Sequence, residues 1–142
     1  MHILVATDAE YVVSDVTAAL SAPDVRFTIC TEGREVSRLV GVGDVDLAIL
    51  DLQIGSKGGM AVSMDLRLDE SAGRIPPVPV LMLLDRKADV HLAKRSDADA
   101  WLIKPLDPLA LKRAVRAALT PLDDLVVDVT PESAEEDPVA AG

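Results

Sequence analysis

Asp46-Leu47-Ala48-Ile49-Leu50-Asp51 is the stretch of sequence around which the rest of the chain is arranged. Its four consecutive apolar residues are typical of a β-strand that is buried on both faces. A glycine-rich loop, residues 52–59, follows it. Burying a carboxylate costs free energy, and ligands of open α/β sheets bind at the carboxyl ends of the strands. We therefore expect Asp51 to belong to a functional site.

Apolar segments of strand length recur along the chain and alternate with segments of helical spacing. We expect strands at residues 2–6, 25–30, 46–51, 80–84 and 100–103. Helices are expected after residues 7–10, at residues 32–40, from about Met60, over residues 85–96 and after Asp107-Pro108. In the third helix, Met60, Met64 and Leu68 form the apolar face. This alternation predicts an α/β domain with a parallel sheet, helices on both faces and right-handed crossovers.

Charge divides the chain into two parts. The net charge of the 142 residues is −10, and residues 121–142 hold seven acids and no base. These acids are Asp123, Asp124, Asp128, Glu132, Glu135, Glu136 and Asp137. We expect residues 1–120 to form one domain and Pro121–Gly142 to be an acidic tail that stays disordered unless a partner binds it. The nearly neutral domain lacks the basic surface of a nucleic-acid-binding protein.

Composition also bears on the cellular compartment. No apolar run is long enough to span a bilayer, and the N-terminus lacks the pattern of a secretory signal. The single cysteine, Cys30, lies in an apolar segment and is expected to be a buried, reduced thiol. We expect a cytoplasmic protein without membrane insertion, which reaches the membrane periphery only through a partner complex.

Charged residues follow four of the five predicted strands. Asp8, Asp51, Asp85 and Lys104 would meet at one edge of the sheet, because the carboxyl ends of parallel strands point the same way. Two neighbouring carboxylates can bind Mg²⁺ together with water and phosphate. A carboxylate beside a metal ion and a lysine can act as a nucleophile toward a phosphoryl donor. Lys104 would neutralise the charge of the incoming phosphate.

From His2 to about Thr120 the chain resembles the receiver domain of bacterial two-component response regulators. Asp51 falls on the phospho-accepting aspartate of that family, Lys104 on the lysine before a proline, and Gly58-Gly59 on the glycine after the phosphorylation loop. The resemblance implies a flavodoxin-like (CheY-like) fold with strand order 2-1-3-4-5. It also implies a histidine kinase as phosphoryl donor and Mg²⁺ held by Asp8, Asp51 and the backbone carbonyl of Gln53. Partners of the family bind the face that runs here from Lys94 to Arg116.

The chain departs from the family pattern at several positions. Thr7 replaces the first of two adjacent acids, and Leu84 replaces the serine or threonine that reports phosphorylation. Leucine cannot donate a hydrogen bond to a phosphoryl oxygen. Asp85 replaces a small residue, and Trp101 replaces the tyrosine or phenylalanine of the switch. We therefore expect the phosphorylation chemistry to be retained and its readout to be impaired.

Simpler roles compete for the same residues. Asp51 could be a capping or solvated acid, and Lys104 could be only its ion-pair partner. Asp8 could cap the first helix, and Thr7 could be a polar strand end. For Asp85, a cap of the fourth helix is the favoured interpretation.

Three classes of function fit these observations to different degrees. The first is a stand-alone receiver that acts through protein–protein contact, because the sequence ends without an output domain. The second is a pseudo-receiver that docks without phosphate as an accessory subunit, and the chain resembles one associated with the respiratory NADH:quinone oxidoreductase. An enzyme ranks last: residues 7–10 are unsuited to a flavodoxin-type flavin phosphate, and Gln53 stands where a haloacid-dehalogenase-type phosphatase needs its second aspartate. A P-loop is absent from the sequence as well.

Overall fold

Five short strands contain the apolar segments identified in the sequence. They are β1 (His2–Ala6), β2 (Arg26–Cys30), β3 (Leu47–Asp51), β4 (Val80–Leu84) and β5 (Ala100–Ile103). In the computed structural model, which describes residues 1–55 and 57–120, all neighbouring strands pair in parallel and the order is β2-β1-β3-β4-β5. Every residue of β1, β3 and β4 is buried. The predicted flavodoxin-like sheet is confirmed, and the tail predicted at residues 121–142 lies outside the described residues.

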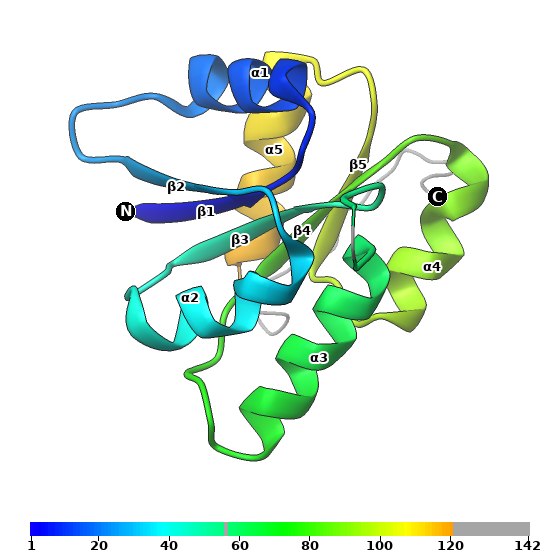
Figure 1. The fold of residues 1–142 in the computed structure, drawn as a ribbon. Helices are drawn as coiled ribbons and strands as arrows, with labels where there is room; N and C mark the ends of the chain where they lie inside the picture. Colours follow the sequence, from blue (N-terminus) through cyan, green and yellow to red (C-terminus); the bar gives the residue numbers. More distant parts are fainter. Residues whose placement is uncertain (56, 121–142) are drawn as a thin grey trace.

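Five α-helices cover the two faces of this sheet (Figure 1). They are α1 (Glu10–Leu20), α2 (Val36–Val42), α3 (Gly59–Ser71), α4 (Val90–Arg95) and α5 (Pro108–Leu119), with 3₁₀ turns η1 (Gly33–Glu35) and η2 (Lys87–Asp89) before α2 and α4. Apolar side chains of α1 and α5 share one core with Ile3, Ile49 and Leu83. On the other face, α2 and α3 pack with Leu4 and Leu50. Helix α4 packs on the end of β4 next to β5. None of the described helices is long and apolar enough to cross a membrane.

The prediction that Met60, Met64 and Leu68 form the face of α3 that packs on the sheet is wrong. Met64 is 45% exposed and Leu68 is 64% exposed, whereas Val62 and Leu66 are buried against the sheet. The cause is the close approach of Gly59 to the end of β3, where an added Cβ would lie 2.7 Å from the carbonyl oxygen of Asp51. This contact fixes the rotation of the helix, and residues three and seven positions after Gly59 then face the core.

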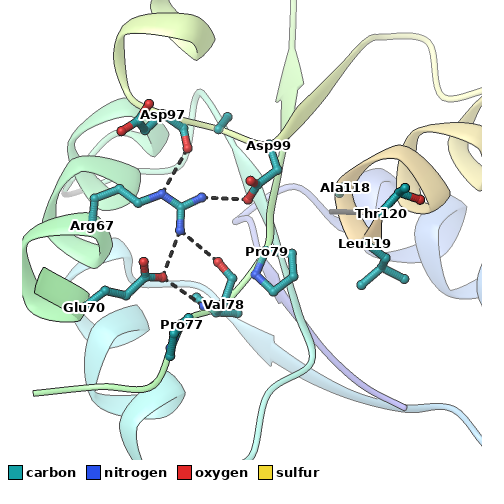
Figure 2. Close-up of a pocket in the computed structure, with 11 residues that line it drawn as sticks. Arg67, Glu70, Pro77, Val78, Pro79, Asp97, Asp99, Ala118, Leu119 and Thr120 are labelled. Carbon is teal, nitrogen blue, oxygen red and sulfur yellow. Dashed lines mark hydrogen bonds and ion pairs between the residues drawn. The ribbon is translucent and has the colours of Figure 1, made fainter. Parts of the chain in front are cut away.

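Arg67 joins α3 to the amino ends of β4 and β5 (Figure 2). Its guanidinium donates to the carboxylates of Glu70 (2.9 Å) and Asp99 (2.7 Å) and to the backbone carbonyls of Val78 (2.9 Å) and Asp97 (3.0 Å). These residues line a hollow of about 540 Å³ that Thr120 also borders. The network lies at the edge of the sheet opposite Asp51, so it supports the fold rather than the candidate site.

Candidate functional site

Asp51 ends β3 and is only 2% exposed. Its Oδ1 accepts hydrogen bonds from the Lys104 ammonium (2.9 Å) and from the backbone amide of Gln53 (3.0 Å). Its Oδ2 accepts from the hydroxyl of Thr7 (2.7 Å). A buried carboxylate needs such partners, because an unpaired one would be strongly destabilising. The structure therefore excludes a solvated Asp51 and brings it together with Lys104, as the sequence predicts.

Lys104 follows β5 and reaches back over the edge of the sheet. Its side chain is 10% exposed, and its ammonium donates both to Asp51 and to Oδ1 of Asp85 (3.2 Å). The ring of Tyr11 on α1 lies 5.9 Å from the ammonium, a distance typical of a cation–π contact. Burial disfavours the charged form, but the two carboxylates outweigh it and raise the pKa of Lys104 above its ordinary value. Lys104 is therefore a cation held between two acids.

Thr7 is fully buried and touches Asp51 directly. Its hydroxyl donates to Asp51 and also accepts from the backbone amide of Ala9 (3.1 Å). The interpretation of Thr7 as a mere polar strand end is wrong. The sequence offered one signal for its contact with Asp51: Thr7 follows β1, and Asp51 ends the neighbouring parallel strand β3.

Asp8 is exposed and does not cap α1, whose N-cap is Ala9 without a side-chain cap. Its Oδ2 instead accepts from the backbone amide of Gly55 (2.9 Å) in the loop after β3. The capping alternative is therefore wrong, and Asp8 lies at the edge of the sheet, bonded to the loop that follows Asp51.

Asp85 does not cap the fourth helix either. The backbone amide of Arg86 (3.2 Å) and its guanidinium (3.0 Å) both donate to Asp89, so Asp89 holds the turn that precedes α4. Asp85 is 35% exposed and bonds to Lys104. The favoured interpretation of Asp85 is thus wrong because its partner lies on the next strand, which no local capping pattern reveals.

The predicted Mg²⁺ ligands are Asp8, Asp51 and the carbonyl of Gln53. Asp8 lies just after β1, and Asp51 ends the adjacent strand β3. All three groups supply oxygen, which Mg²⁺ prefers. The donor set therefore fits the ion in kind. Within residues 1–55 and 57–120, no cluster of three or more histidine, cysteine or acidic side chains suited to a metal is found. Water and phosphate oxygens would have to complete the coordination of Mg²⁺ here.

Of the two glycines at the end of the loop, Gly58 and Gly59, only Gly59 lies so close to other backbone atoms that a side chain would not fit. A Cβ on Gly59 would lie 2.7 Å from the Asp51 carbonyl oxygen and 2.9 Å from Cα of Leu52, whereas one on Gly58 would meet its nearest neighbour at 3.5 Å. Because the close neighbours of Gly59 are backbone atoms, they cannot rotate away. Gly59 thus sets how closely α3 approaches the residue that presents the buried carboxylate.

Leu84 and Trp101 lie on the α4 side of the sheet. Leu84 is fully buried in a small core with Met82 and Ala93, against which Trp101 packs. Trp101 is half-buried, and the ammonium of Lys94 lies 5.8 Å from its ring. Helix α4 therefore packs on the apolar side chain of Leu84, at the position where the family has the hydroxyl of serine or threonine.

Two other groups have structural partners. Nδ1 of His2 donates to the carbonyl of Gly43 (2.6 Å), and its Nε2 lies 2.6 Å from the hydroxyl oxygen of Thr28. Cys30 is buried as predicted, and its thiol donates to the carbonyl of Glu32 (3.0 Å). Burial raises the pKa of the Cys30 thiol above its ordinary value, because it disfavours the charged thiolate. Neither group adds chemistry to the site around Asp51.

Comparison with known proteins places this geometry in a family. The family described as the response regulator receiver domain matches residues 3–116. An uncharacterized response regulatory protein of Mycobacterium tuberculosis, Rv3143, is 38% identical over 97 residues, which is 68% of this chain and 70% of that protein. The DNA-binding response regulator MtrA of M. tuberculosis is 31% identical over 125 residues, 87% of this chain but only 52% of MtrA.

Solved structures show the same fold. The receiver domain of the Pseudomonas aeruginosa sensor histidine kinase PA1611 has a TM-score of 0.70 at 19% identity, and the match covers 83% of this chain and 96% of that one. That structure holds a magnesium ion in its active site cleft. At this identity the likeness concerns the fold, so the roles of individual residues rest on the geometry described above.

Proposed function

Because this chain belongs to the receiver domain family of response regulators, we propose that Asp51 accepts a phosphoryl group from a phosphorylated histidine. Receiver domains are signalling modules that interact with histidine kinases or phosphotransfer proteins. The observation that supports the assignment here is the buried carboxylate of Asp51, bonded at once to Lys104, Thr7 and the loop after β3. These contacts hold one nucleophilic group at the edge of the sheet where ligands of this fold bind.

In the proposed step, an oxygen of Asp51 attacks the phosphorus atom of the donor. A bond forms between that oxygen and phosphorus, and the bond from phosphorus to the histidine nitrogen breaks. The electron pair leaves with the imidazole, which takes up a proton from solvent. Lys104 stabilises the charge on the phosphoryl oxygens, and the Thr7 hydroxyl orients the carboxylate. Mg²⁺, held by Asp8, Asp51 and the Gln53 carbonyl, would supply further positive charge to these oxygens.

We propose that phosphorylation changes the shape of this domain only weakly. Leu84 fills the space under α4 with apolar contacts and offers no donor to a phosphoryl oxygen. Output would then depend on a protein partner at the face that includes Lys94, Arg95, Arg113 and Arg116, all of them exposed on α4 and α5. A partner with acidic side chains is the electrostatic complement of this face.

A phosphate-independent docking module is the second candidate. It is favoured by one observation: without phosphate, both oxygens of Asp51 already have hydrogen-bond donors from the protein. In this function Lys104 and Thr7 would only stabilise the buried acid. The domain would then serve as an accessory subunit of a larger assembly.

Titration of Mg²⁺ and then beryllofluoride, a phosphoryl analogue, distinguishes the two functions. If Asp51 is a phospho-acceptor, calorimetry detects saturable binding of beryllofluoride that Asp51→Asn abolishes. The fluorescence of Trp101, the only tryptophan, should change little on binding, because Leu84 cannot couple the site to β5. Absence of binding would support the docking module. Strong binding with a large fluorescence change would contradict the impaired readout.

A further inference from the structure

The ammonium of Lys104, which is proposed to stabilise the phosphoryl oxygens, bonds to a second carboxylate besides Asp51, that of Asp85. Oδ1 of Asp85 lies 3.2 Å from Nζ of Lys104, and Oδ1 of Asp51 lies 2.9 Å from the same nitrogen. Asp85 directly follows β4, between Asp51 on one neighbouring strand and Lys104 on the other. The unmodified site therefore has an internal anion beside the position of the incoming phosphate.

A phosphoryl group on Asp51 would compete with Asp85 for Lys104. An ammonium has three donors, and two of them already serve the carboxylates. A phosphoryl group carries up to two negative charges, and like charges at this distance repel. Asp85 is 35% exposed and Asp51 is 2% exposed, so Asp85 is the partner that can turn into solvent.

We propose that Asp85 restrains phosphorylation of Asp51 by occupying Lys104 until the phosphoryl group displaces it. Asp85 is a positioning residue in this proposal, which rests on the proposed function because it acts through Lys104. The restraint slows transfer from any donor, because Asp85 and the incoming phosphoryl group compete for the same ammonium.

The test compares Asp85→Asn with the wild type and with Glu10→Gln as a control. Glu10 begins α1 at the same end of the sheet and is exposed, so its substitution makes the same change in net charge at a site that does not involve Lys104. Two quantities are measured: the dissociation constant of beryllofluoride in Mg²⁺, and the rate of phosphorylation by acetyl phosphate, whose leaving group is acetate. Urea unfolding verifies that each variant is folded.

We expect Asp85→Asn to bind beryllofluoride about three- to tenfold more tightly and to react faster by a similar factor, as removal of one screened charge a few ångströms away would produce. The ratios of affinity and of rate between Asp85→Asn and the wild type should fall as salt is added, because salt screens the partly exposed carboxylate of Asp85. A merely structural role for Asp85 would not produce this salt dependence. Glu10→Gln should match the wild type.

Three outcomes would overturn the inference. If Asp85→Asn is no faster than the wild type while Asp51 is phosphorylated, the restraint is absent and the proposed function stands. If Glu10→Gln accelerates the reaction equally, net charge alone explains the effect. If neither the wild type nor Asp85→Asn accepts a phosphoryl group, the proposed function and the inference both fail.

Discussion

Replacing Leu84 by threonine and by valine isolates the effect of one hydroxyl at the end of β4. The two new side chains have nearly the same shape, so both lose the same packing against Met82 and Ala93. Only threonine can donate a hydrogen bond to a phosphoryl oxygen. The pair therefore tests the proposal that a phosphorylated domain with Leu84 lacks a readout because this hydroxyl is missing.

The magnitudes follow from the complete burial of Leu84. Valine removes one buried methylene group and should lower the free energy of unfolding by about 1 kcal/mol. Threonine should cost a further ~1–3 kcal/mol, because its hydroxyl is buried without a matching partner. When beryllofluoride binds, a hydrogen bond to this charged acceptor should return about 1.5–3 kcal/mol. Leu84→Thr should then bind beryllofluoride roughly 10- to 100-fold more tightly than Leu84→Val.

Urea unfolding with and without Mg²⁺ and beryllofluoride measures both effects, and Trp101 fluorescence reports the change beside α4. We expect a fluorescence change on beryllofluoride binding in Leu84→Thr and little change in Leu84→Val. Equal affinities and equal fluorescence in the two variants would refute the proposal that the side chain at position 84 controls the readout.

Three further predictions concern stability and reactivity. Gly59→Ala should lower the free energy of unfolding by about 1–3 kcal/mol, because its Cβ would meet backbone atoms, whereas Gly58→Ala should stay within about 0.5 kcal/mol; equal stabilities in urea would contradict the steric argument. Arg67→Ala should cost ~1–2 kcal/mol, because it removes the guanidinium that bonds the half-buried Glu70 carboxylate and two backbone carbonyls. Arg74→Ala in an exposed pair should cost under about 0.5 kcal/mol. Similar unfolding midpoints of the two variants would show that the Arg67 network is not stabilising. Cys30 should react slowly with iodoacetamide at about pH 8.5 in the native protein and rapidly in urea; fast labelling of the native protein would show that the thiol is accessible. Burial raises the pKa of this thiol in the folded state. The contribution of Cys30 to the free energy of unfolding is therefore complete below the pKa of the unfolded chain and is lost as the pH rises through the pKa of the folded protein.

The strands and their parallel arrangement could be predicted from the sequence because the pattern is strong, whereas their order followed only from the resemblance to the receiver domain family. Residues 47–50 are continuously apolar, which a strand buried on both faces requires, and the alternation with helices allows few topologies. The meeting of Asp51 and Lys104 follows from the same regularity, since both residues end parallel strands at one edge.

The rotation of α3 and the partners of Thr7 and Asp85 could not be predicted in this way. Helix α3 carries two apolar stripes, and the contact of Gly59 with β3 selects Val62 and Leu66 over Met64. Thr7 could be a polar strand end and Asp85 a helix cap, and the sequence pattern favours these local roles because it compares only residues that are close along the chain. Their actual partners lie on neighbouring strands, and only the side-chain geometry shows them.

The Arg67 network at the amino ends of β4 and β5 shares no residue with the site around Asp51. Side chains at one end of the sheet can therefore change during evolution while the other end keeps the strands in register. Thr7 and Leu84, which differ from the family pattern, both lie at the carboxyl end of this intact sheet. A receiver built in this way can lose its signalling chemistry gradually and remain a folded surface that selection can adapt to a new partner.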